Sequence, residues 1–80
     1  MKLSYYPETD SLYIDLADKT SAESREISEG VVLDYDADGT LVGIDIDNAN
    51  EKLILDQLII HKMPVVHTKF RPEVLQHHTG

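Results

Sequence analysis

The 80-residue chain contains no cysteine, so neither disulfide bonds nor thiolate metal sites can stabilise its fold. A chain of this length forms one domain, near the size at which a single hydrophobic core is only marginally sufficient. No apolar run is long enough to cross a bilayer or to form the core of a secretory signal. These absences predict a small soluble protein of the cytoplasm, and the limited core favours a homo-oligomer.

Positive charge is also scarce, because 7 Lys plus Arg residues stand against 15 Asp plus Glu and give a formal net charge of −8. Binding to nucleic acid or to an anionic membrane requires cations near the phosphates, so we expect neither as a partner. The excess of acid permits a basic protein partner or a divalent cation, and it also keeps a protein soluble.

Motifs for the common catalytic mechanisms are missing as well. The serines lie outside any nucleophile-elbow motif, and the 4 glycines are scattered rather than gathered in a phosphate-binding loop. The four histidines lack the spacing of a helical ligand pair, and we interpret them as surface residues. They are His61, His67, His77 and His78. An enzyme is therefore not the expected class.

What the sequence does contain is alternation of apolar and polar residues between acidic turns. This period of two is typical of half-buried strands, and Gly and Asp residues at the turns are typical of hairpins. The expected strands are residues 2–6, 12–16, 22–28, 31–36 and 40–47. The sequence thus predicts about five antiparallel strands in two β-hairpins, with the polar strand 22–28 at a sheet edge.

The pattern becomes helical after residue 48. Asn48, with Glu51 three residues later, outlines a capping box. We therefore expect a helix over residues 49–61, which makes the fold α+β. The isoleucines in this segment leave a strand as the alternative.

This predicted helix carries more apolar side chains than an exposed helix tolerates, which favours burial against the sheet or a second subunit. Leu55, Leu58 and Ile59 form the candidate interaction surface. Pro64 and Pro72 then predict an irregular or partly disordered tail over residues 64–80. The single α+β domain is expected to span residues 1–63.

Two runs of the sequence resemble the bacterial family called domain of unknown function 2283. The first is YYPETDSLYIDL, residues 5–16, and the second combines REI, GVVLDYDADG and LVGIDI within residues 25–46. The resemblance implies a small strand-rich domain followed by a helix, and it implies no activity. Some members are thought to lie beside small toxin-like genes, so it also implies an antitoxin-like role toward a basic toxin encoded nearby.

The same region offers one candidate metal site. Asp34, Asp36, Asp38 and Asp45 stand at positions 1, 3, 5 and 12 of a window with glycine at position 6, close to the spacing of a calcium loop. A calcium loop needs a helix on each side, whereas these flanks alternate as strands do. We therefore interpret the window as a hairpin that reverses at Asp38-Gly39. Calcium or magnesium binding by the four acids stays an alternative.

The leading functional hypothesis is a small acidic protein–protein interaction module. Its motivation is the negative charge, the apolar excess of the predicted helix and the lack of catalytic motifs. A divalent-metal-binding protein or metal-dependent enzyme that uses the acidic hairpin is one alternative. A purely structural homo-oligomer is the other.

Overall fold

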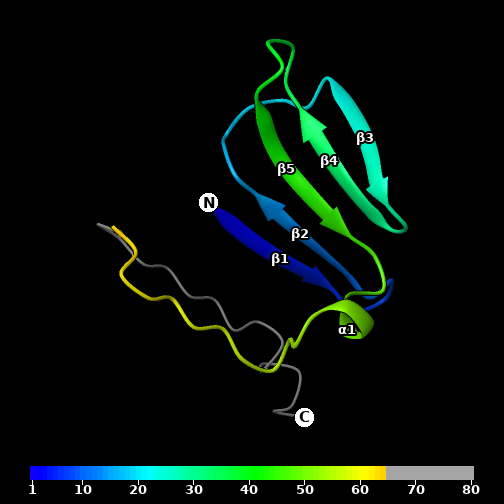
Figure 1. Ribbon diagram of the computed structural model, residues 1–80, viewed down its shortest axis with the longest axis vertical. Helices are drawn as coiled ribbons and strands as arrows, with labels where there is room; N and C mark the ends of the chain where they lie inside the picture. Colours follow the sequence, from blue (N-terminus) through cyan, green and yellow to red (C-terminus); the bar gives the residue numbers. More distant parts are fainter. Residues whose placement is uncertain (65–80) are drawn as a thin grey trace.

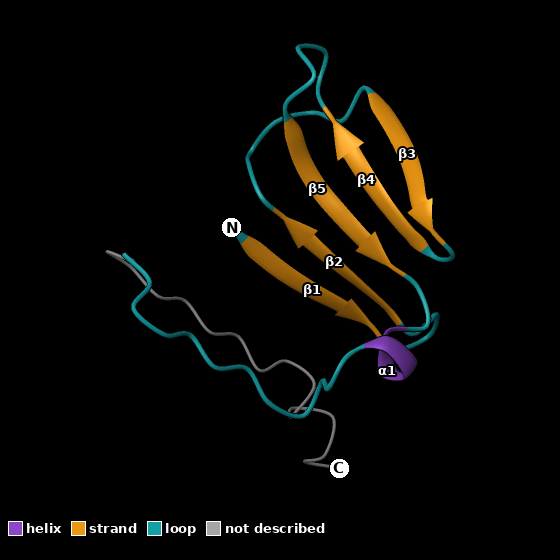
Figure 2. Ribbon diagram, in the orientation of Figure 1, coloured by secondary structure: helices purple, strands orange, loops and turns teal. Residues whose placement is uncertain are grey.

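A computed structural model describes residues 1–64, which form one five-stranded antiparallel β-sheet and a single turn of helix (Figures 1 and 2). The elements are β1 (Lys2–Tyr6), β2 (Ser11–Asp15), β3 (Glu23–Ser28), β4 (Val31–Tyr35), β5 (Leu41–Ile46) and α1 (Ala49–Lys52). The sequence-based prediction of five antiparallel strands is confirmed. The chain is mostly β, because its helix is only 4 residues long.

The order of strands across the sheet is β1-β2-β5-β4-β3. Hairpins join β1 to β2, β3 to β4 and β4 to β5, so the strands from β3 onward form a meander of two hairpins rather than the one that the sequence predicted. The β2–β5 ladder joins the N-terminal hairpin to this meander, with Leu12 opposite Ile46 and Ile14 opposite Ile44.

Cross-strand partners lie on the same face of a sheet, so the register sorts the side chains into two faces. What we call the bare face carries Leu3, Tyr5, Leu12, Ile14, Val31, Leu33, Ile44 and Ile46. What we call the acidic face carries Tyr13, Asp15, Val32, Asp34, Asp45 and Asp47. Residues 43–47 therefore alternate between the two faces, as a half-buried strand does, whereas Val42 lies at an irregularity of the β4–β5 register.

The bare face has no second layer of described chain packed against it. Within residues 1–64, the only buried apolar side chains are Leu12, Val42 and Ala49. The central bare-face residues Leu33 and Ile44 are half-buried. Within residues 1–64 the sheet is thus one layer thick (Figure 2), and the centre of its apolar face is only half-buried by the described chain.

The predicted helix over residues 49–61 is wrong beyond Lys52, because the backbone turns extended at Leu53 (φ −131°, ψ 155°). A surface helix is stabilised by burying one apolar stripe, whereas the run LILDQLII of residues 53–60 is apolar on all sides. Its β-branched isoleucines also favour extended backbone. Residues 53–64 instead form a non-helical segment, which we call the arm (Figure 1).

The predicted capping box does not form either. Asn48 adopts a left-handed backbone (φ 52°) and makes no side-chain cap. Asp10, in the turn between β1 and β2, takes that role: its carbonyl accepts the Ala49 N–H at 2.8 Å, and its carboxylate accepts the Asn50 N–H at 3.2 Å. The helix start is therefore capped from a distant part of the chain.

A side-chain cluster completes this cap. The Tyr5 hydroxyl donates to Asp10 Oδ1 at 2.7 Å, and Asn50 Nδ2 donates to the same oxygen at 2.9 Å. The hydrogen bond from Tyr5 lowers the pKa of Asp10 below its usual value. The cluster fastens α1 to the first hairpin at the end of the sheet.

The remaining sequence predictions concern the tail and the membrane. Apart from Pro64, the tail predicted over residues 64–80 lies outside the described residues, as do His67, His77 and His78. No helix in residues 1–64 has the length and apolar character needed to cross a membrane.

Candidate functional site

Carboxylates from three neighbouring strands gather on the acidic face. They are Asp15 on β2, Asp34 on β4, and Asp45 and Asp47 on or just after β5. Asp15 and Asp34 both lie opposite Gly43 of the central strand β5, one on each side of it. The β2–β5 ladder therefore brings together acids that are far apart in the sequence.

Tyr13 crosses β5 to reach one of these acids. Its hydroxyl donates to Asp34 Oδ2 at 2.9 Å. The ring passes over Gly43, where a Cβ atom would lie 1.9 Å from the Tyr13 hydroxyl oxygen. Gly43 pairs regularly with Asp34, and the irregularity in the register lies beside it, at Val42. Close approach of the Tyr13 ring is thus the reason for glycine at position 43.

Asp34 is satisfied on both carboxylate oxygens, because the Ser24 hydroxyl donates to its Oδ1 at 2.6 Å. Burial and the hydrogen bond to Asp34 raise the pKa of Tyr13 to about 12. Tyr13 therefore stays protonated at neutral pH and acts as a fixed donor. This Tyr13–Asp34–Ser24 group orders the acidic face rather than offering a reactive nucleophile.

Asp45 lies in surroundings that disfavour its ionised form. Burial raises the pKa of Asp45, and the nearby charges of Asp47 and Asp34 raise it further. A cation placed against Asp45 would relieve this repulsion. The acidic face can accordingly attract positive charge, and Asp45 would gain from it.

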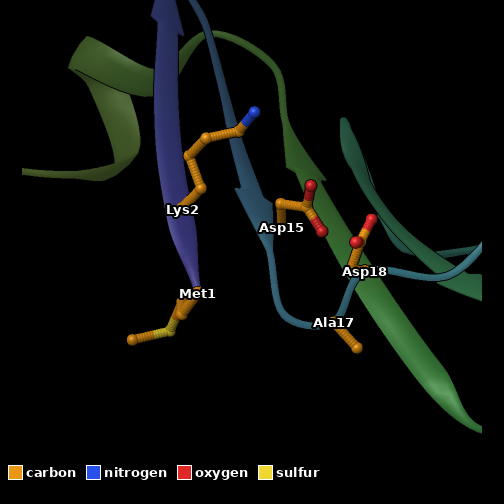
Figure 3. A pocket seen from close by; sticks show the side chains of 5 residues that line it. All are labelled: Met1, Lys2, Asp15, Ala17 and Asp18. Carbon is orange, nitrogen blue, oxygen red and sulfur yellow. The ribbon is translucent and has the colours of Figure 1, made fainter. Parts of the chain in front are cut away.

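Figure 3 shows a recess at one end of the acidic face, where β1 begins and β2 ends. Met1, Lys2, Asp15, Ala17 and Asp18 line it. Lys2 lies opposite Asp15 in the register, but no ion pair within residues 1–64 joins Lys2 to either carboxylate. The recess is a polar surface feature without a catalytic arrangement of the described side chains.

The predicted metal window forms a hairpin turn. Asp36 Oδ1 accepts the N–H groups of Asp38 and Thr40, each at 2.9 Å. Gly39 has a left-handed backbone (φ 84°), which glycine adopts at little cost. The predicted reversal at Asp38-Gly39 is confirmed.

The four acids of that window are divided between different environments. Asp34 and Asp45 lie on the acidic face, Asp36 is buried in the turn, and Asp38 is exposed at the tip. Within residues 1–64, no three His, Cys, Asp or Glu side chains are grouped so that they could hold one metal ion. Calcium or magnesium binding by these residues stays a prediction.

A second feature is an apolar groove of about 600 Å³ between the bare face and the arm. Leu3, Tyr5 and Leu12 line it from the sheet, and Leu53, Leu55 and Leu58 line it from the arm. Of the predicted interaction residues, Leu55 and Leu58 thus meet at one groove. Ile59, further along the arm, is 74% exposed.

Comparison with known families adds one finding. The model of the family described as "Protein of unknown function (DUF2283)" matches residues 2–50, more than half of the chain. The chain belongs to this family. The DUF2283 match covers all five strands and ends within α1, so the arm lies beyond it. No curated protein and no solved structure matches the chain.

Sequence reasoning placed the apolar interaction surface only on residues after 48, and it missed the bare face of the DUF2283 sheet. The signal was available: residues 12–16 and 41–46 alternate cleanly, and five strands need a covering layer. A covering helix was expected from residues 49–61. Because α1 ends at Lys52, that layer is absent from residues 1–64.

Replacing Gly43 with alanine should place a methyl group against the Tyr13 ring. We expect the free energy of unfolding, measured by urea denaturation, to fall by about 1–3 kcal/mol. The loss should shrink in a Tyr13→Val background, where the ring is gone. Gly39→Ala is the control, because its Cβ would meet nothing within 4 Å. Any loss of stability in Gly39→Ala comes from backbone strain and should be the same with and without the Tyr13 ring. An equal Gly43→Ala penalty with and without Tyr13 would refute the steric explanation.

Replacing Asp45 with asparagine should stabilise the protein at neutral pH. An acid whose pKa is raised by folding binds more protons when folded, so its ionisation lowers stability as pH rises through the folded-state pKa. We expect the free energy of unfolding to rise by about 0.5 kcal/mol at pH 7, because the substitution relieves cross-strand repulsion. The gain should vanish below the ordinary carboxyl pKa. Urea denaturation at both pH values measures it, with exposed Asp18→Asn as control, and destabilisation at pH 7 would contradict the prediction.

Proposed function

We propose that this DUF2283 protein is a protein–protein interaction module that buries its bare face against another protein surface. The accessibility of that face carries the proposal. A sheet needs packing on its apolar side for independent stability, and each Å² of apolar surface removed from water contributes about 25 cal/mol. The half-buried Leu33 and Ile44 at the centre of the bare face provide such surface.

The arm enlarges the available apolar surface. Ile54 is 81% exposed and Leu58 is 66% exposed, close to the groove that the arm forms with the bare face. Contiguous apolar surface of this kind is typical of interaction sites. The acidic face has the opposite character, because burying its carboxylates without partners would cost free energy. Because the carboxylates lie on the other face, a partner that binds the bare face needs an apolar surface and not a strong positive charge.

Leu33→Lys tests this proposal against Val32→Lys, its matched control. The two residues are neighbours on β4, both half-buried, and they lie on opposite faces of the sheet. We expect the native chain to sediment as an assembly, Leu33→Lys to sediment at a smaller mass than the native chain, and Val32→Lys to keep the native mass. Circular dichroism checks that both variants retain the sheet.

Two results would count against the bare face as an interaction surface. One is an equal effect of Leu33→Lys and Val32→Lys on the sedimenting mass. The other is a native monomer that binds no apolar dye, because an accessible apolar face should bind such a dye. In that case the bare face is covered within the chain itself.

A second candidate function uses the acidic face to bind a basic small protein, as an antitoxin binds a toxin encoded nearby. The raised pKa of Asp45, caused by burial and by Asp47 and Asp34, favours it. A cationic side chain placed there would gain attraction and remove repulsion.

Co-expression with the basic product of a neighbouring gene tests this second candidate. We expect a complex that weakens with salt, and Asp45→Asn should raise its Kd roughly tenfold, which is about 1.4 kcal/mol. Glu8→Gln, in the exposed β1–β2 turn, is the control and should leave the Kd unchanged. A salt-independent complex, or none, would argue against an acidic binding face.

A further inference from the structure

The two edge strands of the sheet differ in their protection against pairing. At one edge, half of the residues of β3 (ESREIS) are charged, and its register with β4 is irregular between Glu26 and Ser28. Charges and irregularities of this kind block the addition of a further strand. At the other edge, β1 (KLSYY) carries one charge and pairs regularly with β2 over all of its residues. The β1 edge thus lacks both of the features that protect the β3 edge against strand addition.

Hydrogen-bond directions show which backbone groups β1 presents outward. The Leu16 N–H donates to a β5 carbonyl at 2.9 Å. Because this direction alternates along an antiparallel strand, Tyr13 directs its backbone groups to the other side, toward its β1 partner Ser4. Leu3 and Tyr5 therefore direct their N–H and C=O groups away from the sheet.

These four outward groups have no backbone partner within residues 1–64. The arm passes near β1 at the groove, but no backbone hydrogen bond of the described chain links the arm to β1. The side chains of the same two residues are accessible as well, since Leu3 is 44% exposed and Tyr5 is 37% exposed. Within the described chain, both the backbone groups and the apolar side chains of the edge are thus available.

We propose that β1 pairs antiparallel with β1 of a second copy of this chain. With Ser4 opposite Ser4, Leu3 of each copy lies opposite Tyr5 of the other. These two pairs engage all four outward groups of each strand in hydrogen bonds. The product is one continuous ten-stranded sheet, built around a twofold axis at Ser4.

The sequence of β1 is complementary to itself in this register. Leu3 and Tyr5 both belong to the bare face, so the junction joins the two bare faces through apolar contacts. On the acidic face, Lys2 lies opposite Tyr6 of the other copy, an arrangement that suits an ammonium–aromatic contact. Pro7 follows β1 directly and lacks an N–H, which limits the pairing to these residues.

The distribution of charge permits a second copy at this edge, although the two chains carry net charges of the same sign. The carboxylates of the acidic face lie on β2 and the strands beyond it, whereas Lys2 is the charged residue at the junction. Two chains with a net charge of −8 each can therefore meet here without opposing their acids directly. This edge pairing goes beyond the proposed function, and it does not depend on which protein buries the bare face.

Ser4→Cys tests the pairing directly, because the chain has no cysteine and the variant carries one thiol. Residues on the twofold axis of a non-hydrogen-bonded pair have Cα atoms about 4.5 Å apart, within the range of a disulfide. We expect mild oxidation of the folded variant to give a disulfide-linked dimer as the main product. Ser28→Cys, exposed on the β3 edge, is the control and should stay monomeric on a non-reducing gel.

A measurement on the native chain supplements the variant. The amide hydrogens of Leu3 and Tyr5 should exchange slowly in the dimer and faster after dilution, whereas that of Ser4, bonded within the sheet, should be less affected. Ser4→Cys that forms no more dimer than Ser28→Cys, or Leu3 and Tyr5 amides that exchange fast at every concentration, would overturn the pairing.

Leu33→Cys separates this proposal from the proposed function. A disulfide dimer through Leu33→Cys but not through Ser4→Cys would place the second copy on the bare face and remove the edge pairing. A dimer through Ser4→Cys, together with equal effects of Leu33→Lys and Val32→Lys on the mass, would keep the edge pairing and remove the bare-face interaction.

Discussion

The β2–β5 ladder is the pairing on which the rest of the described structure depends. It places Leu12 opposite Ile46 and Ile14 opposite Ile44, and it makes one sheet from a two-stranded hairpin and a three-stranded meander. A lone two-stranded hairpin is only marginally stable in water. The same ladder brings Tyr13 across Gly43 to Asp34 and joins the acids of three strands in one face.

Local chemistry predicted the strands well, and long-range contacts account for most of what it missed. Alternation located the half-buried strands, and Asp38-Gly39 marked a turn because glycine tolerates the left-handed backbone found there. The cap of α1 could not be predicted in this way, since Asp10 and Asn50 are 40 positions apart. The helix predicted beyond Lys52 was wrong because residues 53–60 lack a single apolar stripe and contain β-branched isoleucines, which favour extended backbone.

The candidate site shows the same division. Spacing alone suggested that Asp34, Asp36, Asp38 and Asp45 surround one point, as in a loop between helices. In a hairpin, the period of two and the reversal send them to a sheet face, a buried turn and an exposed tip. The acidic face itself depends on which strands are neighbours, and the order β1-β2-β5-β4-β3 cannot be read from composition.

The ladder also determines how the chain reaches its folded state. The hairpins close over a few residues each, and such local closures take about 1–10 μs. The β2–β5 contact joins Ile14 to Ile44, about 30 residues apart, so it carries the largest loop-closure entropy among the strand pairings. Docking of the preformed hairpin onto the meander is therefore the slow step, and substitutions in that ladder will act on the folding rate more than those in any turn.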